Sequence, residues 1–121
     1  MGNTTSADNY LMKHEAMATI HAEIKTALDH YMKNVINAKE GVEPYVTQAW
    51  LNYTKPGQYH HKHQHPNSFL SGVLYINADK EKDKITFFND DYEQIKLEKK
   101  DWNWYNSRSW YFNIGNADLV I

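Results

Sequence analysis

The hydrophobic spacing of this 121-residue chain changes its period near Pro44. Before that proline, apolar residues recur at steps of three and four, which is typical of one face of an α-helix. The spacing predicts a helix over about residues 10–38, with Ser6 or Asp8 placed to cap its start and Gly41 just past its end. The predicted apolar stripe consists of Met17, Ile20, Ile24, Leu28, Tyr31 and Val35.

The chain after Pro44 is rich in aromatic and β-branched residues, which favour strands. Aromatic residues make up 14% of the whole chain. We predict strands over residues 45–53, 69–76, 85–88, 95–97, 102–105, 110–114 and 119–121. The continuous apolar run 69–76 predicts a strand buried on both faces, with the charged segment 79–84 as a hairpin turn. Trp102, Trp104 and Trp110 are expected in the core. The sequence thus predicts a single domain over residues 1–121 that is mostly β with an N-terminal helix, an α+β fold.

Composition narrows the function classes. The 13 basic and 15 acidic side chains nearly balance, and no basic patch indicates nucleic-acid binding. No apolar run is long enough to span a bilayer, so no membrane partner is expected. The absence of cysteine excludes disulfides and thiolate metal ligands, and it fits a cytoplasmic location.

The candidate metal-binding residues lie in one histidine-rich segment. Four of the seven histidines lie in His60-His61-Lys62-His63-Gln64-His65. If this segment is a strand, then His61, His63 and His65 share one face, because side chains alternate along a strand. Imidazoles suit iron, zinc, copper and nickel. The residues alone leave two interpretations open: a metal site, or an exposed loop whose histidines have a structural role.

The residues around this segment resemble the iron-binding segment of the 2-oxoglutarate/Fe(II) oxygenase superfamily. The resemblance runs from Gln48-Ala49-Trp50-Leu51-Asn52, through Gly57 and His63-Gln64-His65-Pro66-Asn67-Ser68, to Ser71-Gly72-Val73-Leu74-Tyr75. More narrowly, the chain is similar to oxygenases from bacteria and marine phages. The resemblance implies a double-stranded β-helix, or jelly roll, and an oxygenase of hydroxylase type. The implied cofactors are Fe(II) and 2-oxoglutarate, with ascorbate as an assay additive. If the chain is phage-encoded, the expected location is the host cytoplasm.

The resemblance assigns roles to six residues. His63 and His65 are the implied iron ligands, although the family more often has a carboxylate at the second position. Tyr75 and Asn77 are implied contacts of the oxo acid, or else packing residues. Asn67 and Ser68 are implied hydrogen-bonding supports of the ligands, or else they shape the turn after Pro66. The substrate is not indicated.

Two further features of the family have no counterpart in these residues. Its distal histidine follows a strand similar to Gly115-Asn116-Ala117-Asp118-Leu119-Val120-Ile121, and its 2-oxoglutarate-binding arginine comes later still. We therefore expect the sequence to be C-terminally incomplete and the 121-residue chain alone to be inactive. An open strand at Ile121 would leave a sheet edge that favours self-association, so a homo-oligomer is expected.

Three alternatives remain. A cupin would share the spacing from Gly57 to His63 and His65, but a cupin needs a glutamate where Phe69 and Leu70 stand. A second alternative is a non-enzymatic jelly-roll module, such as a phage structural or binding protein. A third is a zinc hydrolase in which His61 joins His63 and His65. Same-face neighbours on a flat strand are ~6.6–6.8 Å apart, which makes three such ligands on one ion difficult.

Overall fold

The structure is a computed structural model that describes residues 2–89 and 97–121. It divides into two compact units, Met1–His63 and Gln64–Ile121. The first unit carries the helical region, and the second carries most of the paired strands. Within the described residues, no helix is both long and apolar enough to cross a membrane.

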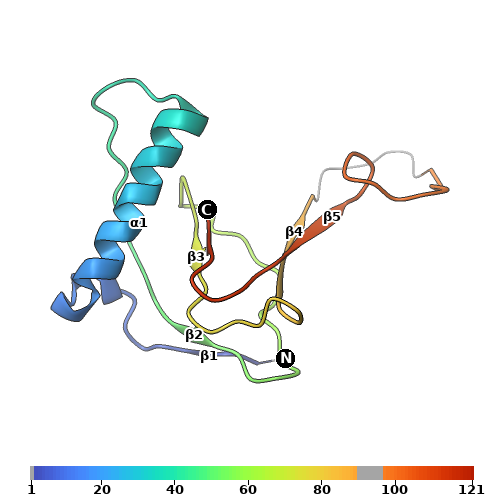
Figure 1. Ribbon diagram of the computed structural model, residues 1–121, viewed down its shortest axis with the longest axis horizontal. Coiled ribbons are helices and arrows are strands. Elements are labelled where there is room, and N and C mark those ends of the chain that lie inside the picture. The colour runs from blue at the N-terminus through green and yellow to red at the C-terminus, as the bar shows by residue number, and fades with distance from the viewer. Residues whose placement is uncertain (1, 90–96) are drawn as a thin grey trace. The chain divides into compact units, whose positions relative to one another are not determined.

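The first unit contains a helical region that runs from Leu11 to Ile36 (Figure 1). It begins with the 3-10 turns η1 (Leu11–Lys13) and η2 (Glu15–Met17), continues as α1 (Ala18–Tyr31), and ends as the π-helix η3 (Met32–Ile36). The predicted helix over 10–38 is therefore present, although not as one uniform α-helix.

The C-terminal end of this helical region corrects two predictions. Asn37 adopts the left-handed conformation (φ 53°), and the N–H of Ala38 bonds the carbonyl of Met32 at 3.1 Å. A left-handed residue with such a six-residue bond ends a helix, so Asn37 and not Gly41 ends it. The wider π turn also changes which side chains of η3 continue the apolar face of α1. Met32 is consequently buried at 6% exposure, while Val35, which was predicted in the apolar stripe, is 61% exposed.

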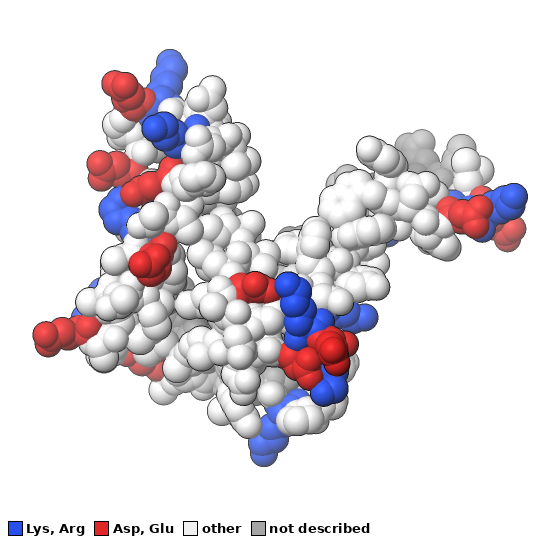
Figure 2. Space-filling view, in the orientation of Figure 1, with Lys and Arg blue, Asp and Glu red and all other residues white. Residues whose placement is uncertain are grey.

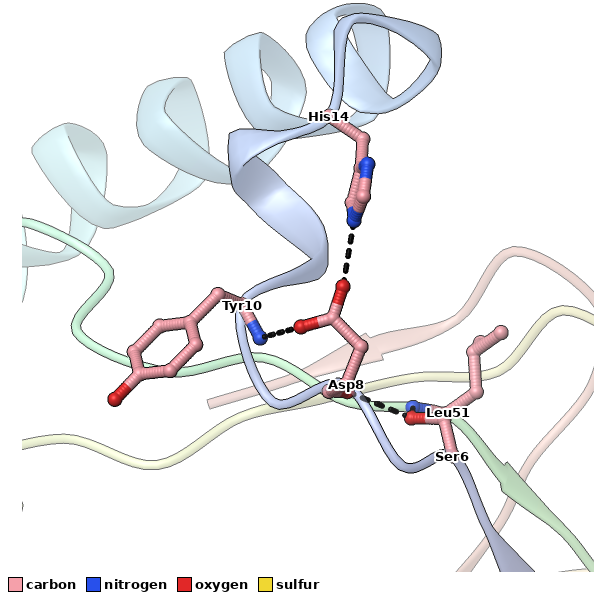
Figure 3. Close-up of polar contacts among 5 residues, drawn as sticks. All are labelled: Ser6, Asp8, Tyr10, His14 and Leu51. Atoms are coloured by element: carbon pink, nitrogen blue, oxygen red, sulfur yellow. Dashed lines mark hydrogen bonds and ion pairs between the residues drawn. The ribbon is translucent and has the colours of Figure 1, made fainter.

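The N-terminal segment is fixed beside residues 49–53 by backbone and side-chain bonds. β1 (Thr4–Thr5) pairs antiparallel with β2 (Asn52–Tyr53). The Ser6 hydroxyl accepts the N–H of Leu51 at 3.1 Å, and the Asp8 carboxylate accepts the N–H of Tyr10 at 2.7 Å and contacts His14 at 2.5 Å (Figure 3). Asp8 thus fastens the segment before η1. The predicted capping of the helix by Ser6 or Asp8 is wrong for α1, whose N-cap Met17 makes no side-chain cap bond.

The second unit contains two antiparallel pairs. β4 (Lys84–Phe88) pairs with β5 (Ser109–Asn113), and β3 (Val73–Leu74) pairs with β6 (Leu119–Val120). Along the chain, β4 and β5 both fall between β3 and β6. The two pairs are therefore nested, as in a long antiparallel hairpin whose outer strands are β3 and β6. β4 and β5 agree with the predicted strands within one residue, and they run side by side in Figure 1.

Other predicted strands are shorter or absent. Strand 45–53 is reduced to β2 and an isolated bridge between Ala49 and Tyr10. Strand 69–76 is reduced to β3, and its predicted double burial is wrong, because only two residues are paired and Phe69 is 74% exposed. The segment 79–84 does turn, with Asp83 N–H bonding Asp79 O at 2.7 Å, but it joins β3 to β4, which do not pair.

The predicted strand 102–105 is a turn, for a reason that lies in two asparagines. The Asn103 side chain accepts the N–H of Tyr105 at 2.9 Å, and the Asn106 side chain accepts the N–H of Asn103 at 2.8 Å. Such side-chain bonds compete with strand pairing. Residues 95 and 96 of the predicted strand 95–97 lie outside the described residues.

The described residues form an α+β arrangement with three two-stranded antiparallel sheets, and they do not show the expected jelly roll. Met32 and Ile114 are their buried hydrophobic side chains. On the face drawn in Figure 2, basic and acidic side chains are interspersed along the helix and at the turns, in keeping with the balanced charge.

Candidate metal centre

The histidine-rich segment follows a tight turn at the end of the first unit. Gly57 adopts φ 78°, which glycine tolerates without strain, and the N–H of Gln58 bonds the carbonyl of Lys55 at 3.0 Å. Residues 58–65 then continue without strand pairing, and all of them are exposed. The histidines therefore do not lie on a strand, and the shared face that a strand would give His61, His63 and His65 does not form.

Three imidazoles converge in this irregular segment. His60, His61 and His63 each offer a ring nitrogen, and these three atoms lie within 4.8 Å of one another. The rings of His60 and His63 stack, with centroids 4.6 Å apart and planes 25° apart. His61 lies 5.1 Å from His60 and 5.3 Å from His63 between ring centroids. A turn of irregular backbone thus gathers neighbours that a strand would have separated onto two faces.

A hydrogen bond fixes the protonation of the His63 ring. Its Nδ1 lies 2.8 Å from the backbone oxygen of His61. Because a carbonyl oxygen only accepts, Nδ1 carries the proton, and Nε2 carries the lone pair in the neutral ring. Metal-binding histidines commonly donate their second ring nitrogen to a backbone carbonyl in this way. His63 therefore has the protonation and support that an iron ligand needs.

His65 is the second residue of the second unit and is exposed. Its carbonyl accepts the N–H of Ser68 at 3.2 Å, which closes a turn around Pro66. The Ser68 hydroxyl donates to the carbonyl of Leu70, so its observed bond shapes the turn. Asn67 is exposed in the same turn. The roles of Asn67 and Ser68 as supports of the metal ligands stay predictions.

Tyr75 and Asn77, the two predicted contacts of the oxo acid, differ in environment. Tyr75 is half-buried, and its backbone is held by the N–H of Ala117 at 2.7 Å and the carbonyl of Asp118 at 2.9 Å. Burial raises the pKa of its phenol, and because even an unperturbed phenol is protonated at neutral pH, the O–H is a hydrogen-bond donor there. Asn77 is exposed. Tyr75 is thus the better fixed of the two.

The tryptophans predicted in the core are exposed instead. Trp102 is 67% exposed and Trp104 is 55% exposed. Trp104 contacts Trp110 edge-on, with ring centroids 4.9 Å apart. The turn at residues 103–106 carries Trp104 outside the strand register that the prediction assumed, whereas Trp110 lies in β5 and is 38% exposed there.

Sequence reasoning missed the part played by His60 and its support. The amide of Asn3 donates to Nδ1 of His60 at 3.3 Å and to the side chain of Asn52 at 3.0 Å. The only signal in the sequence was the density of histidines, because a contact spanning 57 residues has no local pattern.

A sequence model of the family described as "Putative 2OG-Fe(II) oxygenase" matches residues 48–121. The match covers more than half of the chain and includes the histidine-rich segment. The chain belongs to this family of 2OG-Fe(II) oxygenases. No curated protein and no solved structure matches the chain.

Membership implies Fe(II) and 2-oxoglutarate as cofactors. The donors in the matched segment fit iron, because imidazole is a ligand that iron accepts and the ring of His63 has its lone pair on Nε2. No acidic residue lies between Thr54 and Ser68, so the segment is unsuited to magnesium or calcium, which prefer oxygen ligands.

Proposed function

We propose that this chain provides iron ligands for an Fe(II)- and 2-oxoglutarate-dependent oxygenase of the hydroxylase type. The observation that carries the proposal is the family match over residues 48–121, which contains His63-Gln64-His65. When bound, iron and 2-oxoglutarate together supply the oxygen activation that hydroxylation of a C–H bond requires. The residues of the chain bind and orient these groups.

His63 and His65 are the proposed protein ligands. The bond from Nδ1 of His63 to the carbonyl of His61 holds the ring in the tautomer that offers Nε2 to iron. His65 leads into the turn closed by Ser68, which restricts the backbone next to the ligand. A histidine in place of the family's usual carboxylate leaves the ligand set less negative, and we expect weaker iron binding than a His–carboxylate pair gives.

Tyr75 is the proposed donor to a carboxylate of the oxo acid. Its phenol is protonated at neutral pH, and a hydrogen bond from a neutral O–H to a carboxylate is charge-assisted. Asn77 is proposed to assist from two residues further on. The C–H substrate is left open.

The test is succinate formation from 2-oxoglutarate by the full-length protein with Fe(II) and ascorbate. We expect His65→Ala to abolish turnover and His30→Ala, which changes an exposed helix histidine, to leave it unchanged. Tyr75→Phe should raise the KM for 2-oxoglutarate about tenfold, since a hydrogen bond to a charged group contributes roughly 1.5–3 kcal/mol. Absence of turnover in the wild type with iron bound would contradict the proposal and favour a metal-binding module without oxygenase activity.

A further inference from the structure

We propose that His60, His61 and His63 form a second metal site, for a late first-row divalent cation such as Zn²⁺, which shares His63 with the iron ligands. The site is built on irregular backbone in the first unit. It differs from the ligand pair proposed for iron, because it excludes His65 and adds two histidines.

The rings must reorient to hold an ion, because those of His60 and His63 are stacked and imidazole lone pairs lie in the ring plane. The three ring nitrogens already lie within 4.8 Å of one another. Two nitrogens bound to one tetrahedral zinc at ~2.1 Å are about 3.4 Å apart. All three side chains are exposed, so their rings can rotate closer without displacing a packed core.

Hydrogen bonds orient two of the three rings. Nδ1 of His63 donates to the carbonyl of His61, which leaves the Nε2 lone pair for a metal. Nδ1 of His60 accepts the Asn3 amide, so its proton sits on Nε2. Coordination through Nε2 of His60 uses the other neutral tautomer, in which the proton has moved through solvent from Nε2 to Nδ1, and the Asn3 amide then rotates so that its oxygen accepts from Nδ1–H.

The donor chemistry selects the cation. The three ligands are neutral imidazoles, and the segment from Thr54 to Ser68 has no carboxylate. For nitrogen ligands, affinity rises from Fe²⁺ through Co²⁺ and Ni²⁺ to Cu²⁺, with Zn²⁺ also above Fe²⁺. The ammonium of Lys62 opposes a dication, but it is exposed and salt screens it. The cluster therefore favours zinc over iron.

The iron ligands and the zinc ligands both include His63. The two ions therefore cannot bind at the same time, because one Nε2 binds one ion. Zinc on His60, His61 and His63 withdraws His63 from iron. This competition rests on the proposed function, whereas the zinc site itself does not.

The zinc site is tested by titrating the metal-free full-length protein with ZnCl2 by calorimetry, and with CoCl2 by visible absorption. We expect His60→Ala and His61→Ala each to weaken zinc binding by roughly 10–100-fold, the loss that even supporting residues of a metal site cause. His65→Ala and the control His30→Ala should leave zinc affinity unchanged. Circular dichroism of each variant shows whether the fold is retained.

The opposite pattern would overturn the site: zinc affinity lost in His65→Ala and retained in the His60→Ala, His61→Ala double variant. Zinc binding too weak to measure in the wild type would overturn it as well. For the competition, zinc should lower iron retention more in the wild type than in that double variant, where zinc competes only at His63 and His65. Zinc binding without any iron binding would sink the proposed function and leave the zinc site standing.

Discussion

The histidine-rich segment and the β4–β5 hairpin are held in different ways. Five consecutive residue pairs join β4 to β5, and the bonds Asn89 N–H to Arg108 O and Ile114 N–H to Asp83 O extend the ladder at both ends. Residues 58–65 have no ladder, and their observed bonds are isolated ones, such as those at His63 and Asn3. The hairpin is thus a scaffold element, whereas no strand ladder constrains the backbone of the histidines.

A proline substitution in each region should give the largest difference between them in the loss of stability. Bonded pairs alternate along an antiparallel ladder, so the N–H of Phe112 faces Ile85 across the strands. Phe112→Pro removes this donor and the edge contact with Phe87, whose ring centroid is 6.1 Å away. We expect a loss of about 2–4 kcal/mol in the free energy of unfolding. Urea denaturation measures it.

The matched substitution in the histidine-rich segment is Lys62→Pro. It removes no ladder bond, and we expect a change within about 0.5 kcal/mol. Equal losses from the two prolines would show that the histidine-rich segment is held as firmly as the hairpin, and the comparison would fail.

Truncating one aromatic in each region should give a smaller contrast. Phe87 is 46% exposed and packs edge-on against Phe112, so Phe87→Ala should cost about 1 kcal/mol. Tyr59, at 61% exposure, borders the histidines, and Tyr59→Ala should change stability by less than about 0.5 kcal/mol. Thermal unfolding of both variants checks the order, and a larger loss from Tyr59→Ala would reverse it.

The smallest effect concerns the side-chain bonds that fasten the first unit. The hydrogen bond to His14, followed by the N–H of Tyr10, holds the pKa of Asp8 below its usual value. A carboxyl with a lowered folded-state pKa stabilises the fold above the unfolded pKa of about 3.9, and this contribution is lost as the pH falls through the folded value.

We therefore expect Asp8→Asn to lower the melting temperature slightly at pH 6, with the difference from wild type shrinking below about pH 4. Glu40→Gln, at an exposed position, is the control. A difference that persists unchanged at pH 3 would mean that Asp8 acts by packing and not by its charge.

Local periodicity predicted the elements that local bonds stabilise. The helix over 10–38 and the strands at 85–88 and 110–114 are present, because their patterns match the backbone period of the element. The π turn at Met32 was not predictable, since nothing in the spacing marks where a helix widens. Asn103 and Asn106 overrode strand propensity at 102–105 through bonds to the backbone.

The candidate site was predictable in composition but not in geometry. The density of histidines and the family resemblance pointed to His63 and His65. Alternation along a strand was the wrong basis for grouping them, because residues 58–65 pair with no strand. The approach of Asn3 to His60 depends on the β1–β2 pairing. Strands of two residues leave no recognisable pattern in the sequence, so this pairing was not predictable.

The central claim is that His63 and His65 hold iron, and iron content after anaerobic Fe(II) loading tests it most directly. The full-length wild type and the His30→Ala variant should retain iron after desalting, in equal amounts. The His63→Ala, His65→Ala double variant should retain less than about a tenth as much. Removing the ligands themselves should weaken metal binding at least as much as removing the residues that hydrogen-bond to ligands does. Equal iron retention by the double variant and the wild type would contradict the account.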